Sequence, residues 1–227
     1  MPLITLSLII GFQDKKPEIP FAKEIAAFVA ADQKNPPAKG QILFVGSSSF
    51  QRWNDVATYF PKHRILNRGF GGSSLADVIR FQSQVIDPYQ PAQVVIYCGE
   101  NDIAGADRPS AYETYQRFMT LYGNIRRKMP TTPISYVSIK PSPTRWIFRW
   151  KMIAANAWIK DIAATDKNFT FIDVWEAMLD KDRRPIADIF VEDGIHMNAK
   201  GYKIWAGIIE PFLVKQKEPV KIKIGAK

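Results

Sequence analysis

The sequence predicts an α/β fold in which one parallel β-sheet is covered by helices on both faces, giving a three-layer α/β/α sandwich. Apolar runs of strand length alternate along the chain with segments of helical periodicity, which is the pattern of such sandwiches. The 227 residues, 46% of them hydrophobic, suffice for one domain with a large core. The sequence has no internal repeat, low-complexity segment or interdomain linker. We therefore expect a single domain over residues 17–214, between a leader at 1–16 and a basic tail at 215–227.

Five helices and five strands account for the pattern in order. The first helix is expected over residues 20–33 with Pro20 in its first turn, and Asn35-Pro36-Pro37 ends it because a residue before proline disfavours helix. The strands are expected at residues 42–45, 65–67, 93–98, 134–139 and 169–173. The other helices are expected at residues 75–85, 111–128, 151–164 and 199–213. Strands separated by helices pair in parallel, which predicts the sheet.

Composition argues against several classes of function. The net charge of +9 arises from 31 basic and 22 acidic residues, but residues 215–227 alone hold five lysines and one glutamate. No basic stretch is interleaved with aromatic residues, so we expect no nucleic-acid partner. His63 and His196 are the two histidines of the chain and cannot by themselves form a multi-histidine metal centre, so we expect no metal and no other cofactor. Cys98 lies in a predicted strand and is expected in the core.

An apolar run at residues 3–11 is too short to cross a bilayer as a helix and resembles the hydrophobic region of a signal peptide. No basic residue precedes the run, and no Ala-x-Ala cleavage pattern follows it. We expect a bacterial protein exported to the periplasm or the exterior, without stable membrane insertion. The alternative is an ordinary strand or leader on a cytoplasmic protein. The sequence does not indicate the oligomeric state.

Small and polar residues follow the first three predicted strands and precede the last helix. The segments are Gly46-Ser47-Ser48-Ser49, Arg68-Gly69-Phe70-Gly71-Gly72, Gly99-Glu100-Asn101-Asp102 and Glu192-Asp193-Gly194-Ile195-His196. Ligands of parallel sheets bind outside the carboxyl ends of the strands, where loops carry the chemistry. These segments are therefore expected to form the functional site.

Ser48, His196 and Asp193 supply the hydroxyl, the imidazole and the carboxylate of an acyl-transfer site. Asp193 lies three residues before His196 and can accept its Nδ1 proton, which leaves Nε2 free to act as a base toward Ser48. Two simpler interpretations stay open: Ser48 as the N-cap of a helix, and an Asp-Gly turn before a helix capped by Asn198, with His196 exposed. Gly72 and Asn101, with the backbone N–H of Ser48, can serve as donors to an oxyanion. They can equally belong to ordinary turns and caps.

The four segments together resemble the signature blocks of the SGNH hydrolase superfamily, the GDSL esterases and lipases, over residues 41–212. The resemblance implies that Ser48 is the nucleophile, His196 the base and Asp193 its orienting acid. It also implies an oxyanion hole of Ser48, Gly72 and Asn101. The aspartate of the family's first block is replaced by Ser47. The fold that the family implies is a flavodoxin-like sandwich with strand order 2-1-3-4-5.

Substrate choice is expected to depend on the loop over residues 140–150, which is rich in aromatic residues and arginines. Trp146, Phe148 and Trp150 can stack on a sugar or cover an acyl chain. Either Arg145 or Arg149 can meet an anionic group. Trp53 can line the pocket or simply pack. The alternative for the loop is a helix start whose aromatic residues face the core while its arginines face water.

Because the chain has no long apolar lid, we expect a serine ester hydrolase for short-chain or carbohydrate-borne acyl esters, acetyl esters in particular. Its partner is then a small-molecule or glycan ester. The alternatives are a lysophospholipase, a thioesterase, or a non-catalytic glycan-binding domain on an esterase-like scaffold.

Overall fold

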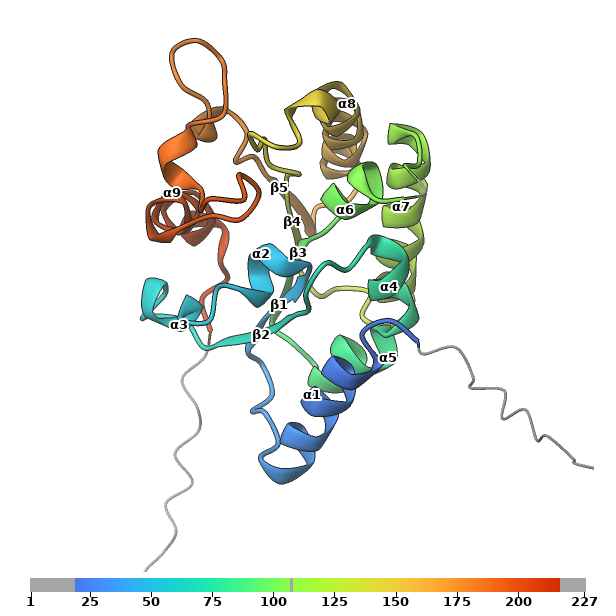
Figure 1. The fold of residues 1–227 in the computed structure, drawn as a ribbon. Helices are drawn as coiled ribbons and strands as arrows, with labels where there is room; N and C mark the ends of the chain where they lie inside the picture. Colours follow the sequence, from blue (N-terminus) through green and yellow to red (C-terminus); the bar gives the residue numbers. More distant parts are fainter. Residues whose placement is uncertain (1–18, 107, 217–227) are drawn as a thin grey trace, which may run out of the picture.

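The computed structural model describes residues 19–106 and 108–216, and Figure 1 shows a parallel sheet between two layers of helices. The strands are β1 (Ile42–Gly46), β2 (Ile65–Gly69), β3 (Gln93–Tyr97), β4 (Ile134–Val137) and β5 (Phe169–Ile172), in the order β2-β1-β3-β4-β5. Every neighbouring pair is parallel. The three-layer α/β fold and the strand order 2-1-3-4-5 are therefore confirmed.

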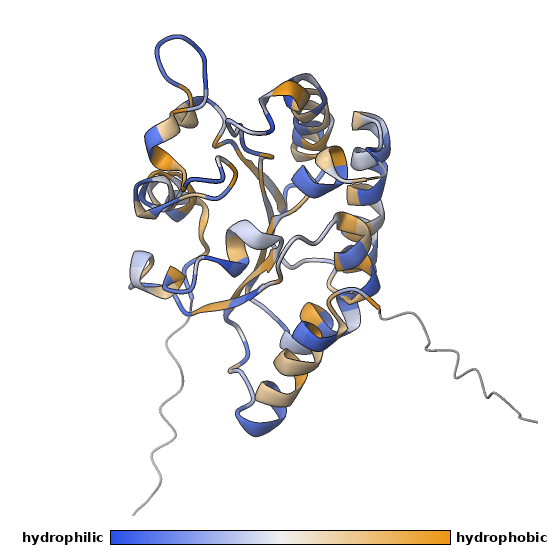
Figure 2. Ribbon diagram, in the orientation of Figure 1, coloured by the Kyte–Doolittle hydropathy of each residue, from blue (hydrophilic) through white to orange (hydrophobic). Residues whose placement is uncertain are grey.

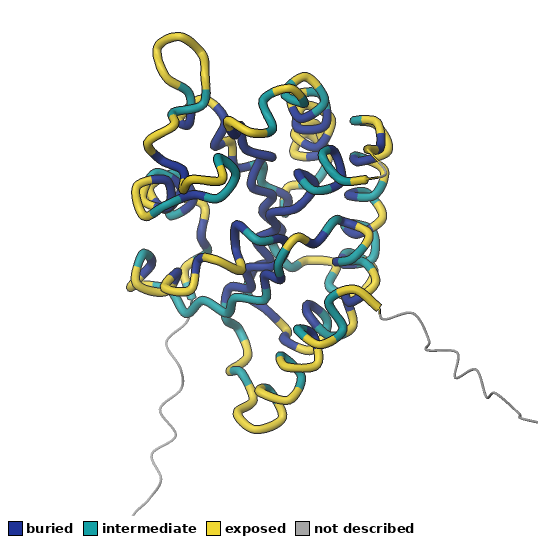
Figure 3. Tube along the Cα trace, in the orientation of Figure 1, coloured by how far each residue is buried: buried dark blue, intermediate teal, exposed yellow. Residues whose placement is uncertain are grey.

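Two hydrophobic clusters hold the layers together, one on each face of the sheet. Alternate side chains of β1 enter different clusters, Leu43 and Val45 on one face and Ile42 and Phe44 on the other, because successive residues of a strand point to opposite faces. Much of the sheet is accordingly hydrophobic in Figure 2. The central strands β1, β3 and β4 are buried along their whole length, whereas the edge strands β2 and β5 are buried only in part (Figure 3). The first face packs against α1 (Ala22–Lys34), α4 (Leu75–Arg80), α5 (Gln82–Val85), α7 (Ala111–Lys128) and α8 (Arg149–Lys160). The second packs against α2 (Ser48–Gln51), α3 (Val56–Tyr59) and α9 (Ala199–Ile209).

Helix ends agree with the sequence where a cap defines them. For α7 both predicted ends are confirmed, and a reciprocal capping box of Ser110 and Glu113 fixes its start. The helix predicted over 75–85 is instead interrupted at Phe81, whose backbone leaves the helical region between α4 and α5. The last helix ends at residue 209 and continues as a 3₁₀ turn that contains Pro211. At the other end of the chain, Pro20 precedes α1 and is not in its first turn.

The predicted leader at 1–16 and residues 217–227 of the predicted tail lie outside the described residues, so the signal-peptide interpretation stays a prediction. Among the described residues, no helix combines the length and apolar character that spanning a membrane requires. Cys98 is fully buried, as expected of a core residue.

Candidate active site

The chain turns sharply after β1 and presents Ser48 at the carboxyl end of the sheet. Gly46 makes this turn possible with a φ of 137°, and a Cβ atom at this position would lie 1.9 Å from the carbonyl oxygen of Tyr97 on β3. Ser47, not Ser48, occupies the N-cap position of α2, and it makes no side-chain capping bond. The interpretation of Ser48 as an N-cap is therefore wrong, and its hydroxyl is available for another partner.

His196 connects Ser48 to Asp193 through both ring nitrogens. Nε2 lies 2.9 Å from Oγ of Ser48, and Nδ1 lies 2.6 Å from Oδ2 of Asp193. Asn198 caps α9 by accepting from the backbone N–H groups of Lys200 and Gly201, which fixes the end of the loop that carries His196. The Asn198 cap predicted by the simpler interpretation is therefore present. The His196 ring is nevertheless not free in solvent, because each of its nitrogens has a side-chain partner. The structure brings together the three residues that the sequence singled out.

Asp193 is held as a carboxylate by the groups around it. Its Oδ1 accepts hydrogen bonds of 2.8 Å from the backbone N–H groups of Ile195 and His196. Partial burial acts to raise the pKa of Asp193, but the hydrogen bonds from the His196 ring and from these two N–H groups outweigh it and place the pKa far below its ordinary value. A charged Asp193 favours the proton on Nδ1 and leaves Nε2 as the acceptor toward Ser48.

Gly72 lies in the loop that follows β2, and Asn101 lies in the first turn of α6 (Glu100–Ala104), which follows β3. Gly72 has a φ of 73° and open space around the position of a side chain, so its backbone conformation and not crowding requires glycine. Nδ2 of Asn101 donates to the carbonyl oxygen of Ser73 at 3.0 Å, which fixes the amide and leaves its second N–H available. In the part of the chain that the structure describes, the backbone N–H groups of Ser48 and Gly72 donate to no protein acceptor.

Two residues to which the sequence analysis assigned no individual role, Ser73 and Asp102, hold these segments together. Ser73 is fully buried, and its hydroxyl donates to the carbonyl oxygen of Gly46 at 3.1 Å, so the turns after β1 and β2 are joined. Asp102 accepts from the backbone N–H of Leu75 and from Arg117, each at 2.9 Å, and so ties α6 to α4 and α7. Each is a polar residue beside a predicted site residue, and that position is the signal that could have found them.

The predicted substrate-binding residues have different surroundings. Trp53 has no exposed surface and stacks on Tyr202 at 4.8 Å inside the core, so the prediction that it lines the substrate pocket is wrong. Trp146 is partly buried and stacks on Trp175 at 6.1 Å. Arg145 is 19% exposed and makes an ion pair with Glu100, the residue before Asn101.

The remaining aromatic residues of the 140–150 loop divide between the core and the surface. Phe148, like Trp146, packs against the hydrophobic cluster on the first face of the sheet, whereas Trp150 is 67% exposed. The interpretation that the aromatic residues face the core therefore fits the first two and fails for Trp150.

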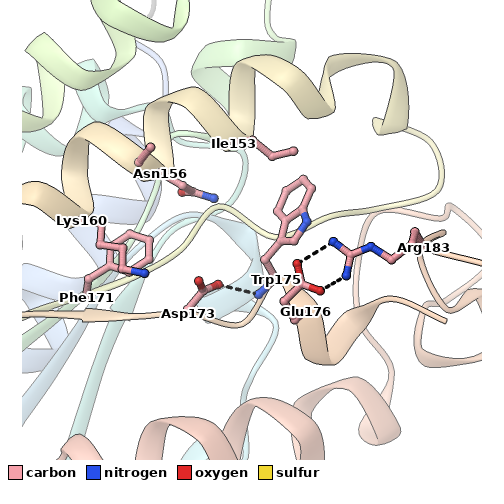
Figure 4. Close-up of a pocket in the computed structure, with 9 residues that line it drawn as sticks. Ile153, Asn156, Lys160, Phe171, Asp173, Trp175, Glu176 and Arg183 are labelled. Carbon is pink, nitrogen blue, oxygen red and sulfur yellow. Dashed lines mark hydrogen bonds and ion pairs between the residues drawn. The ribbon is translucent and has the colours of Figure 1, made fainter. Parts of the chain in front are cut away.

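A pocket of about 320 Å³ opens between α8 and the end of β5 (Figure 4). Asp173 there accepts a hydrogen bond of 3.0 Å from the backbone N–H of Trp175, and Glu176 is paired with Arg183. Neither His196 nor its partners Ser48 and Asp193 line this pocket, so it is separate from the serine site. Within residues 19–106 and 108–216, no group of three or more histidine, cysteine, aspartate or glutamate residues could hold a metal ion.

The fold is a parallel α/β sandwich, and its polar residues gather at the carboxyl ends of the strands, where such sheets bind their ligands. The chain belongs to the GDSL-like lipase/acylhydrolase family, whose model matches residues 38–204, and so to the SGNH hydrolase superfamily. It is a carboxylic ester hydrolase. No curated protein has a significantly similar sequence.

Solved structures share the fold at low sequence identity. A protein of Streptococcus pneumonia superposes with a TM-score of 0.73 at 20% identity, covering 85% of this chain and 92% of the other. A GDSL-like lipase from Bacteroides thetaiotaomicron has a TM-score of 0.66 at 23% identity, covering 85% and 94%. A carbohydrate esterase family 3 protein from Talaromyces cellulolyticus has a TM-score of 0.59 at 16% identity, covering 76% and 95%.

Proposed function

We propose that this hydrolase cleaves esters with Ser48 as nucleophile, His196 as general base and acid, and Asp193 as the carboxylate that orients His196. The observation that carries the proposal is the continuous chain of contacts from Ser48 Oγ through both nitrogens of His196 to Asp193. An isolated serine is a poor nucleophile at neutral pH, and an adjacent base of this geometry is what activates it.

The reaction proceeds in two halves. Oγ of Ser48 attacks the carbonyl carbon while Nε2 of His196 takes the hydroxyl proton, and the carbonyl electron pair moves to the oxygen. The bond to the alcohol then breaks, and His196 returns the proton to the departing alkoxide. A water molecule releases the acyl group from Ser48 by the same steps, with His196 again taking and returning a proton. Asp193 remains ionised and stabilises the imidazolium.

The oxyanion of each tetrahedral intermediate is stabilised by the backbone N–H groups of Ser48 and Gly72 and by the amide of Asn101. Supporting this assignment, the two N–H groups lack a protein acceptor in the described part of the chain, and Ser73 holds the Asn101 amide. Donors fixed in advance need no reorganisation as charge develops on the substrate oxygen.

We infer short-chain or carbohydrate-borne acyl esters, acetyl esters in particular, as the substrates. The similarity to a carbohydrate esterase family 3 protein supports this class, as does the similarity to an acetyl esterase solved with an acetate ion, which has a TM-score of 0.60 at 16% identity. Esters with longer acyl chains are the comparison substrates that test this preference for acetyl esters.

The test compares hydrolysis of para-nitrophenyl acetate, butyrate and octanoate, and deacetylation of acetylated xylan, by wild type and Ser48→Ala. Ser83→Ala, which changes an exposed serine after the start of α5, is the matched control. We expect Ser48→Ala to lose about 10⁴-fold or more in kcat while Ser83→Ala keeps full activity, and acetate to be the best ester. Equal rates for wild type and Ser48→Ala would refute the mechanism, and a preference for octanoate would refute the substrate class.

A further inference from the structure

A buried ion pair lies directly beside the proposed oxyanion donor. Glu100, which precedes Asn101, is 3% exposed, and Lys140 in the segment that follows β4 is 0% exposed. Nζ of Lys140 donates to Oε2 of Glu100 at 2.5 Å, and the hydroxyl of Tyr97 donates to the same oxygen. Burial acts to raise the pKa of Glu100, but Lys140 and Arg145 outweigh it and lower the pKa, so the carboxylate is charged at neutral pH.

Arg145 is a second cation on the same carboxylate and lies nearer to solvent. Its Nη1 is 3.1 Å from Oε1 of Glu100, and 19% of its side chain is exposed. Beyond this ion pair its guanidinium has no protein acceptor in the described part of the chain, and none of its nitrogens is both buried and unpartnered. A guanidinium has five N–H donors in a planar fork that fits carboxylate or phosphate. Arg145 therefore offers donors to solvent while Glu100 holds it in place.

The position of Arg145 is fixed relative to the loop that carries His196. The preceding residue, Thr144, donates its hydroxyl to the carbonyl oxygen of Asp193 at 2.7 Å and its backbone N–H to the carbonyl oxygen of Gly194 at 3.2 Å. Since His196 returns the proton to the alcohol in the proposed reaction, the alcohol part of the substrate lies on the side of this loop. Arg145 is thus linked to both parts of the site, through Glu100 to the residue beside Asn101 and through Thr144 to the loop that carries His196.

The charges around Arg145 leave it available to an anion. Lys140 and Glu100 neutralise each other. Asp193 also acts on Lys140 electrostatically, but its own oxygens are engaged by His196 and by two backbone N–H groups. The net charge of +9 further favours the approach of an acidic substrate.

We propose that Arg145 is a specificity-determining residue that binds an anionic group, a carboxylate or a phosphate, on the alcohol part of the ester substrate. The inference rests on the proposed function, because it assigns the substrate class of the same site. The buried pair of Glu100 and Lys140 acts as its support.

Three acetyl esters with related leaving groups test this inference: para-acetoxybenzoate, para-acetoxyphenyl phosphate, and the neutral methyl ester of para-acetoxybenzoate. They are compared in wild type, Arg145→Met and Arg145→Lys. Arg149→Met is the matched control, since the Arg149 guanidinium lies over the rings of Trp146 and Trp150. We expect Arg145→Met to lower kcat/KM for at least one anionic ester about tenfold or more, through KM, while the neutral ester is unchanged. Arg145→Lys should retain part of the preference, and Arg149→Met all of it.

The two anionic esters identify the group that is bound, because the one with the larger loss in Arg145→Met carries it. An unchanged ratio of anionic to neutral rates in Arg145→Met would overturn the inference and leave the proposed function standing. An equal loss on all three esters would also overturn it, since that result assigns Arg145 a structural role. Hydrolysis of none of the three by wild type would overturn the proposed function and this inference with it.

Discussion

Replacing Asn101 by alanine removes the side-chain donor of the proposed oxyanion hole. Nδ2 of Asn101 is fixed at 3.0 Å from the carbonyl oxygen of Ser73, so its remaining N–H is oriented before substrate arrives. Loss of one such donor costs about 3 kcal/mol in the barrier, which is roughly a hundredfold in kcat. The lost bond to Ser73 costs about 1 kcal/mol of stability, or about 2–4 °C in Tm for a chain of this size.

The assay measures kcat and KM for para-nitrophenyl acetate together with Tm by calorimetry. We expect Asn101→Ala to lower kcat while KM changes little, because the donor acts mainly in the transition state. Asn101→Asp, which keeps the size and removes the N–H donors, should be at least as slow. Asn124→Ala on α7 is the control and should be fully active. A folded Asn101→Ala protein whose kcat lies within about twofold of wild type would refute the role of Asn101.

Three further predictions concern the scaffold. Gly46→Ala should lower the free energy of unfolding by about 3 kcal/mol or more and abolish activity, because the added Cβ collides with the backbone of β3. Gly207→Ala on α9, where the space for a Cβ is open, should instead raise the free energy of unfolding by at most about 1 kcal/mol. Urea unfolding of the two variants measures both changes. The hydrogen bonds of Asp166 outweigh burial and lower its pKa below the ordinary 3.8. Asp166→Asn should therefore cost about 1–2 kcal/mol at pH 7, and this cost should shrink as the pH falls below 3.8 toward the lower pKa of the folded state, measured as Tm against pH. Lys140→Met should cost about 3–5 kcal/mol by leaving Glu100 buried with less compensation, and adding Glu100→Gln should recover most of it in a double-mutant cycle.

The sheet and the serine site could be predicted because their signals are local. The central strands β1 and β3 are short, mostly apolar runs, and the capping box of Ser110 and Glu113 places the start of α7. Ser48 and His196 lie 148 residues apart, yet each is marked by its own short segment at a strand end or before a helix. These two segments, together with the rule that the carboxyl ends of parallel strands lie along one edge of the sheet, were enough to predict that Ser48 and His196 share a site.

Features that depend on packing could not be predicted in the same way. Trp53 lies close to Ser48 in the sequence, which is compatible both with lining the substrate pocket and with stacking on Tyr202 in the core. Only the folded structure shows that it stacks. The pair of Lys140 and Glu100 joins residues 40 positions apart with no periodic pattern between them. The helix break at Phe81 likewise has no glycine or proline to announce it.

The central claim is that Ser48 is the activated nucleophile, and covalent labelling tests it most directly. A fluorophosphonate reacts with an activated serine by forming a phosphorus–oxygen bond and releasing fluoride. Tandem mass spectrometry of the labelled peptide can separate Ser48 from its buried neighbours Ser47 and Ser49. We predict a single adduct on Ser48 of the wild-type protein and none on Ser48→Ala. An adduct on another residue, or an active wild-type enzyme that remains unlabelled, would contradict the account.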